Sequence, residues 1–155
     1  MQTNTNKSLL AAAFCCGLAA LAHAGCILFG ADWYRFFGAG EQMAQLAAQG
    51  HWYPTVVTST IIFVLLLWAC YALSGAGAIK RLPLTRLALV LISSILLLRG
   101  LAFVWLMPLF PENSLLFWLV SSGICLLMGG LFAAGSWQQW PKLSAKTAAA
   151  ASRLF

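Results

Sequence analysis

The residues with the most chemical potential in this chain are an arginine, a histidine and several hydroxyl side chains that interrupt long apolar runs. Arg99 stands inside LISSILLLRGLAFVWLM, where a charge is costly unless it faces protein, water or a partner. At about 1.5 Å per residue it lies roughly 12 Å below Met107, and His23 lies roughly 10 Å below Gly30. The hydroxyl side chains at a similar depth are Thr58, Ser59, Ser121 and Ser122. We therefore expect Arg99, His23 and these hydroxyls to form a polar, ligand-binding pocket.

A structural role for Arg99 competes with this interpretation. The guanidinium could extend toward the lipid headgroups, or it could pair with an acid to hold a loop against the helices. The acids available as loop partners are Asp32, Glu41 and Glu112. A single histidine among helices is more typical of hydrogen-bonded packing, and helical serines and threonines often bond their own backbone. The pocket hypothesis therefore depends on the shared depth of these residues.

Other site chemistries find little support in the sequence. The cysteines are Cys15, Cys16, Cys26, Cys70 and Cys125, and they contain no C-x-x-C motif. A haem held between helices needs facing histidines, whereas His51 stands at a loop edge. The chain also has too few suitably placed ligand side chains to bind a metal ion. We predict no cofactor, no metal and no catalytic residue.

The composition identifies the environment that surrounds these residues. The chain of 155 residues is 62% hydrophobic and only 8% charged, whereas about a quarter of the residues in soluble domains are charged. There is room for four membrane spans of roughly 20 residues each with short connections. We expect an all-α membrane protein with one integral domain over residues 1–155, built as a bundle of four transmembrane helices with a short external amphipathic helix.

The apolar runs give the expected boundaries of the spans. They are residues 9–30, 56–73, 84–107 and 115–135, with an external loop over 31–55 and a cytoplasmic tail over 141–155. Pro141 is expected to end the fourth helix. The first run also resembles a secretory signal that is cleaved after Ala22-His23-Ala24. We favour an uncleaved span because the apolar run continues to Phe29.

The basic residues predict the orientation of the spans, because cytoplasmic loops retain Lys and Arg. One side of the four-span arrangement carries only Arg35. The other side carries Lys7, Lys80, Arg81, Arg86, Lys142, Lys146 and Arg153. Both termini are thus predicted to be cytoplasmic. The net charge of +6 reflects this topology, so we predict no nucleic-acid partner. On the external side, EQMAQLAAQ predicts the amphipathic helix.

A family resemblance adds to these observations. The runs DWYRFFGAGEQMA, YALSGAGAIKRLPL and LLLRG resemble a group of small uncharacterised bacterial inner-membrane proteins with four spans. The resemblance covers most of the chain. It implies a bacterial inner membrane and brings no established activity, ligand or site residue.

These observations favour a non-enzymatic, multi-pass protein. It is expected to bind a lipid, a small amphiphile or a membrane-protein partner through an outer-leaflet polar pocket, with membrane lipids and a second copy of itself as possible partners. One alternative is a dimeric transporter of an anionic or lipidic compound, although no carboxylate lies inside a span to couple transport to cations. The other is a membrane enzyme that acts on a lipid headgroup with His23 as its acid-base group.

Overall fold

The computed structural model describes residues 5–111 and 113–151 of the protein, and this part of the chain is helical, without strands. Two short helices lie between the first and second long helices, and a bent segment follows the third long helix. The elements are α1 (Lys7–Phe29), α2 (Ala31–Phe36), α3 (Glu41–Ala48), α4 (Trp52–Ala76), α5 (Thr85–Leu101), α6 (Phe103–Leu106), the 3₁₀ turn η1 (Met107–Leu109) and α7 (Leu115–Ala151). The all-α prediction is confirmed.

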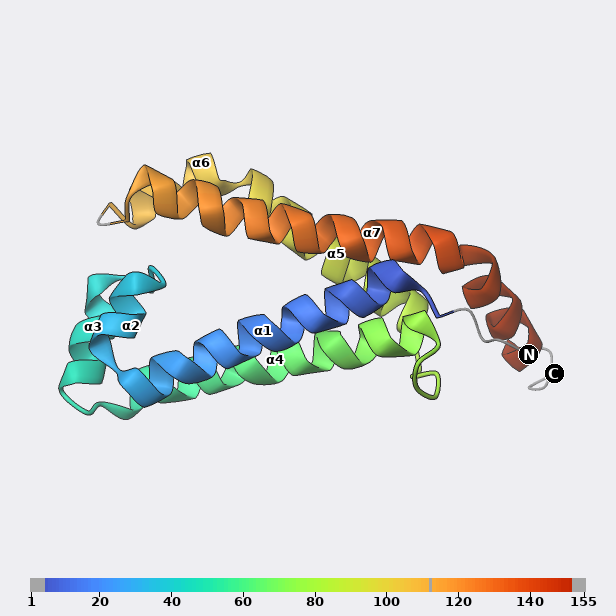
Figure 1. Cartoon of the computed structure of the whole chain (residues 1–155), viewed down its shortest axis with the longest axis horizontal. Helices are drawn as coiled ribbons and strands as arrows, with labels where there is room; N and C mark the ends of the chain where they lie inside the picture. The colour runs from blue at the N-terminus through green and yellow to red at the C-terminus, as the bar shows by residue number, and fades with distance from the viewer. Residues whose placement is uncertain (1–4, 112, 152–155) are drawn as a thin grey trace.

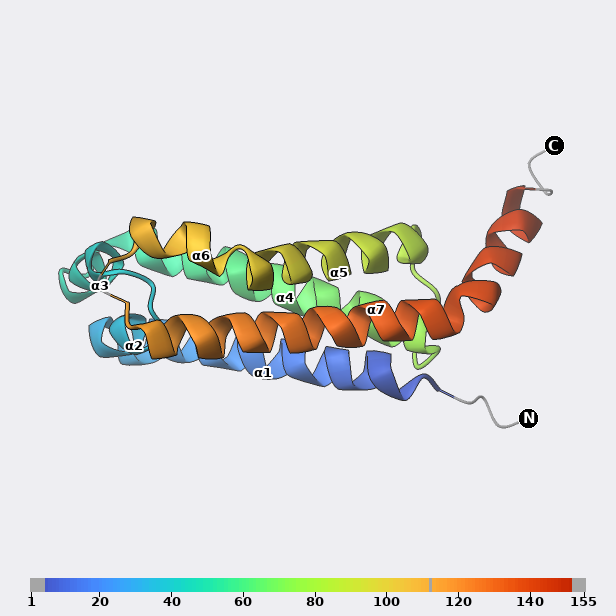
Figure 2. The same cartoon turned by 90° about the horizontal axis from the view of Figure 1, so that it is seen from above.

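The long helices pack as two hairpins (Figures 1 and 2). α1 lies along α4, and α5 lies along α7. The hairpins meet near the start of α1, where Leu9 packs against Gly135. They diverge toward α2, α3 and α6 at the opposite end of the molecule (Figure 1).

Small residues explain why α1 and α4 approach so closely. Ala12, Cys16 and Ala20 recur every four residues on one face of α1, and all three are buried. Ala72 and Ala76 of α4 are buried in the same core. Small side chains at this spacing let helix backbones come together, which is how helices associate when lipid removes the hydrophobic difference between them.

Three helices are long and apolar enough to cross a membrane, namely α1, α4 and residues Leu115–Pro141 of α7. The third expected span is broken. α5 ends at Leu101, and the following α6 and η1 segment is bent from it by 62°. If this bent pair is one span, the number of candidate spans is four. Gly100 weakens the helix just before the bend, because glycine has a high conformational entropy outside the helix.

Pro141 does not end the last helix, so that prediction is wrong. α7 continues through Pro141 to Ala151, and its ribbon turns away from the bundle in this region (Figures 1 and 2). Proline removes one backbone hydrogen bond and crowds the preceding turn, which can bend a helix without terminating it.

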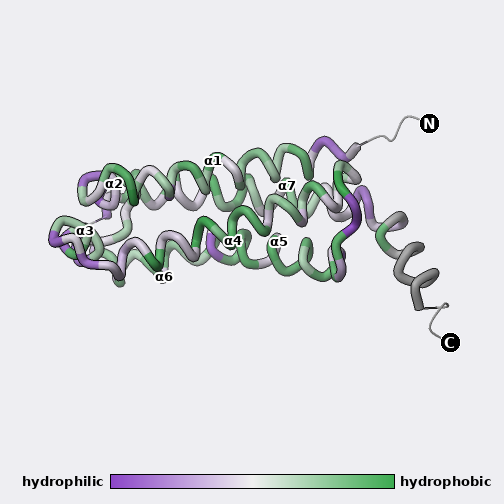
Figure 3. Tube along the Cα trace, turned by 90° about the horizontal axis from the view of Figure 1, so that it is seen from below, coloured by the Kyte–Doolittle hydropathy of each residue, from purple (hydrophilic) through white to green (hydrophobic). Residues whose placement is uncertain are grey.

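Hydropathy varies along the long axis of the bundle (Figure 3). The hairpins are largely hydrophobic, and hydrophilic segments gather around α2 and α3 at one end and around the α4–α5 connection at the other. A helix forms over Glu41–Ala48, where the sequence predicts one. Its Ala44 is buried and packs near Cys26 and Tyr34 in a small core separate from the main one.

Candidate functional site

The acids of the α2–α3 region bind Arg35, which belongs to the same region. Arg35 donates to both carboxylate oxygens of Glu41, at 2.9 Å from Nε and 2.8 Å from Nη2, and to Asp32 Oδ1 at 3.1 Å from Nη1. These bonds lower the pKa of Glu41 and raise the pKa of Arg35. Asp32 and Glu41 were expected to pair with Arg99. Arg35 lies only a few residues from each acid, so it reaches them at a smaller entropic cost.

Glu112, the remaining expected partner of Arg99, lies outside the described residues.

Two of the predicted polar residues on α1 and α4 have hydrogen-bond partners other than Arg99, and the third is exposed. Thr58 Oγ1 and Tyr34 Oη are hydrogen-bonded at 2.9 Å in a buried contact between α4 and α2. His23 Nδ1 donates to the carbonyl oxygen of Ala19 at 2.7 Å, one turn earlier in α1. Ser59 is exposed on the outer surface of α4. Within the described chain, no hydrogen bond or ion pair links His23, Thr58 or Ser59 to Arg99.

A second group of polar side chains lies between α5 and α7. The Arg99 guanidinium carbon is 5.3 Å from the centre of the Trp118 ring. Trp118 is 2% exposed and Ser122 is 3% exposed, and they stand one turn apart on α7. The buried atoms Arg99 Nη1, Trp118 Nε1 and Ser122 Oγ have no hydrogen-bond partner in the described part of the chain. We call Arg99, Trp118 and Ser122 the donor cluster.

Close packing of α5 on α7 positions the donor cluster. Ser93 Oγ donates to the carbonyl oxygen of Gly129 at 3.1 Å. A Cβ atom on Gly100 would lie 2.6 Å from Leu126 Cγ and 3.1 Å from the backbone oxygen of Ser122. Only glycine allows this approach, which places the last turn of α5 beside Trp118. Arg99 belongs to that turn, where the helix dipole favours a cation.

The chemistry of the donor cluster calls for an oxygen acceptor. Guanidinium and indole N–H groups only donate hydrogen bonds, and a hydroxyl can donate one. A buried donor without an acceptor costs about 1–3 kcal/mol. A carboxylate or phosphate oxygen placed here would accept these bonds and balance the charge of Arg99. The arrangement is therefore suited to holding an oxyanion.

The structure brings only part of the predicted pocket together. Arg99 lies over Trp118, which stands one helical turn before Ser122 on α7, and Ser121 is half-buried next to Ser122 in sequence. Trp118 was missed because an aromatic residue near the end of an apolar run normally marks the membrane interface. Its position four residues before Ser122 places both on one helix face, which is the signal that could have revealed it.

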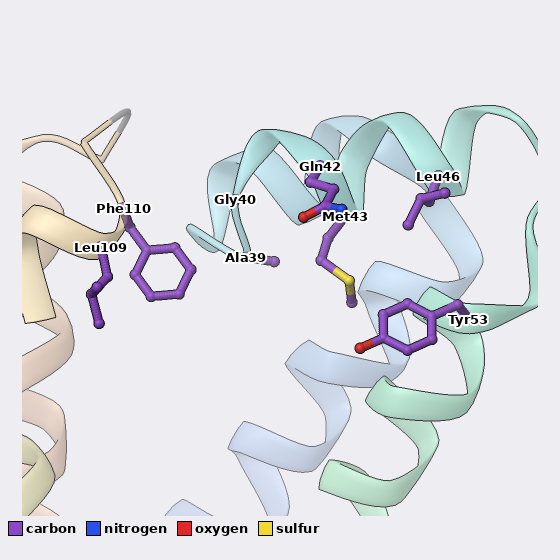
Figure 4. Close-up of a pocket in the computed structure, with 8 residues that line it drawn as sticks. All are labelled: Ala39, Gly40, Gln42, Met43, Leu46, Tyr53, Leu109 and Phe110. Carbon is purple, nitrogen blue, oxygen red and sulfur yellow. The ribbon is translucent and has the colours of Figure 1, made fainter.

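A pocket of about 370 Å³ lies next to the donor cluster, between α3 and the end of η1 (Figure 4). Met43 and Tyr53 face Leu109 and Phe110 across the opening in this view. The full lining is Ala39, Gly40, Gln42, Met43, Leu46, Tyr53, Leu109 and Phe110. The Phe110 ring is 6.3 Å from the Trp118 ring, centre to centre. Phe110 is thus shared between the pocket and the donor cluster.

The fold and the site together define a helical protein with three or four candidate membrane spans and a buried set of hydrogen-bond donors. No known protein family matches the chain, and neither does any curated protein or solved structure. Among the described residues, no group of three or more metal-ligating side chains occurs.

Proposed function

We propose that this protein is a non-enzymatic, four-span protein of the bacterial inner membrane that binds a lipid or small amphiphile through an oxyanion. The observation that carries the proposal is the donor cluster, whose buried Arg99, Trp118 and Ser122 atoms have no partner within the described chain. A scaffold role would place Arg99 in a tight ion pair with an acid. The described acids pair instead with Arg35.

The membrane arrangement is part of the same proposal. If the bent α5 to η1 segment is one span, there are four candidate spans, and an even number of spans would leave both termini on the same side of the membrane. Lys80 and Arg81 are exposed at the end of the bundle where α1 begins. By the positive-inside rule this end is cytoplasmic, and α2 and α3 are external. The pocket and the donor cluster then belong to the outer half of the protein.

The binding proposal is tested by native mass spectrometry with lipid identification. We compare wild type, Arg99→Gln and Arg86→Gln, each purified in mild detergent. Arg86 is a matched control because its guanidinium carbon also lies over a tryptophan ring, 3.7 Å from the centre of Trp140. An anionic amphiphile should accompany wild type and Arg86→Gln, and it should be absent from Arg99→Gln.

Each variant is first checked for retained helical content and a monodisperse elution profile. If folded Arg99→Gln carries the same anionic species as wild type in the same amount, Arg99 is not a ligand contact and the proposal fails.

A further inference from the structure

We infer that the pocket between α3 and η1 holds the apolar body of the ligand whose acidic group binds the donor cluster, so that the ligand is a small amphipathic acid and not a two-chain phospholipid. This inference rests on the proposed function and specifies the ligand class. It adds residues of α3, α4 and η1 to a site that the donor cluster defines only on α5 and α7.

The size of the pocket supports a small ligand. Its volume of about 370 Å³ is near the lower end of the roughly 300–1,000 Å³ that small-molecule sites occupy. Such a volume suits one short apolar body better than two acyl chains.

The lining of the pocket supports an amphipathic ligand. Met43, Leu46, Leu109 and Phe110 provide apolar surface. Gln42 and Tyr53 add an amide and a phenol hydroxyl, and the close-up shows both residues at the same opening (Figure 4). The surface of the lining is about as polar as it is apolar, which suits a ligand that carries both kinds of group.

A continuous row of contacts connects the pocket to the donor cluster. Phe110 lines the pocket, its ring contacts Trp118 at 6.3 Å, and Trp118 lies under the Arg99 guanidinium at 5.3 Å. Aromatic and apolar surface therefore leads from the pocket to the charge. An acid with its body in the pocket would direct its oxyanion toward Arg99.

The donor atoms are buried, so the ligand must displace a side chain that separates the pocket from the donor cluster. Phe110 is the residue best placed to move. It follows α6 and η1, neither of which contains a buried residue. This segment is joined to α5 at the 62° bend that follows Arg99. Few contacts would be lost if Phe110 moved away from Trp118, and the unpartnered donors would then gain the oxygen atoms of the ligand as acceptors.

The chemistry of the cluster selects an acid over a neutral amphiphile. A carboxylate presents two acceptor oxygens and a negative charge, and a phosphate monoester presents three oxygens. An alcohol of the same chain length lacks the charge. The shared feature is the oxyanion, and in the competition test the acid that displaces the label at the lower concentration identifies whether a carboxylate or a phosphate is preferred.

The test uses the full-length protein in nanodiscs of phosphatidylcholine. Binding of radiolabelled dodecanoate is measured in competition with unlabelled dodecanoate, dodecyl phosphate or dodecanol. Either acid should compete at least about tenfold better than dodecanol, because the alcohol offers the Arg99 guanidinium no charged acceptor. Equal competition by dodecanol would overturn the assignment to an acid.

The pocket is tested by filling it. Ala39→Phe places a ring in the pocket and should weaken dodecanoate binding about tenfold, by analogy with overpacking. Ala48→Phe makes the same change at an exposed α3 residue outside the lining and should change binding less than about twofold. If Ala39→Phe does not fold, Leu46→Ala is used to enlarge the pocket, and it should shift the preference toward tetradecanoate.

The outcomes separate this inference from the proposed function. Loss of binding in Arg99→Gln, with normal binding in Ala39→Phe or an unchanged chain-length preference in Leu46→Ala, would overturn the pocket assignment and leave the donor cluster as the site. Normal binding in Arg99→Gln would overturn both.

Discussion

At the scale of single residues, two serines on facing helices differ in their hydrogen bonding. Ser93 of α5 donates to the carbonyl oxygen of Gly129, whereas Ser122 of α7 has a buried Oγ with no partner in the part of the chain that is described. Both are buried. The same chemical group therefore stabilises the α5–α7 pair at one position and is left unsatisfied at the other.

Replacing each serine by alanine should change stability in opposite directions. Ser93→Ala removes a hydrogen bond and should lower the free energy of unfolding by about 1 kcal/mol. Ser122→Ala removes an unsatisfied hydroxyl and should raise it by about 1 kcal/mol in ligand-free protein. Thermal unfolding followed by circular dichroism in detergent measures both. A loss of stability in Ser122→Ala as large as that in Ser93→Ala would mean that the hydroxyl is bonded after all.

At the scale of elements, two glycines of α5 and α7 have different surroundings. A Cβ atom on Gly100 would meet Leu126 and the Ser122 backbone, whereas one on Gly123 would meet nothing within 4 Å. Gly100 therefore sets the distance between the helices. Gly123 is not needed for that contact.

Alanine substitutions distinguish the two glycines. Gly100→Ala should lower the free energy of unfolding by about 1–3 kcal/mol, because α5 must move away from α7 or Leu126 must change its rotamer. Gly123→Ala should raise it by up to about 1 kcal/mol through helix propensity. Chemical unfolding of both variants gives the comparison. Equal stability of the two would contradict the close packing at Gly100.

Asn6 joins three elements at the scale of the whole molecule. Its Oδ1 accepts from the Leu9 N–H at 2.9 Å and caps α1, while its Nδ2 donates to Gln138 Oε1 of α7 at 2.6 Å. Its backbone N–H donates to the carbonyl oxygen of Ala76 at the end of α4 at 3.2 Å. One residue thus ties the two hairpins together at the end where they meet.

Graded substitutions of Asn6 should separate these contributions. Asn6→Asp keeps the helix cap and loses the donor to Gln138, so it should cost about 1 kcal/mol. Asn6→Ala loses both and should cost about 1 kcal/mol more. Gln138→Ala is the control that removes only the side-chain bond between the hairpins, and its unfolding midpoint should match that of Asn6→Asp. A neutral Asn6→Ala would show that the cap and the bond are replaced by water.

The positions of the long helices were predictable from local sequence. The expected spans over residues 9–30 and 56–73 lie within or close to α1 (Lys7–Phe29) and α4 (Trp52–Ala76). α4 begins earlier than expected because His51 caps it and Pro54 is tolerated in the first turn of a helix. The third and fourth spans were less predictable, since the bend after Leu101 and the continuation through Pro141 depend on packing as well as on local preference.

What the sequence by itself determined is the class of the protein: uncharged apolar runs long enough to span a bilayer form helices because every backbone group in lipid must be bonded within its own segment. Only the tertiary structure decided which polar groups meet. Arg35 pairs with Asp32 and Glu41 because it lies close to them in sequence, and His23 and Thr58 have other partners. The packing of α5 on α7 places Arg99 over Trp118. Shared depth in a membrane specifies the height of a side chain, whereas its neighbours depend on how each helix is rotated and packed.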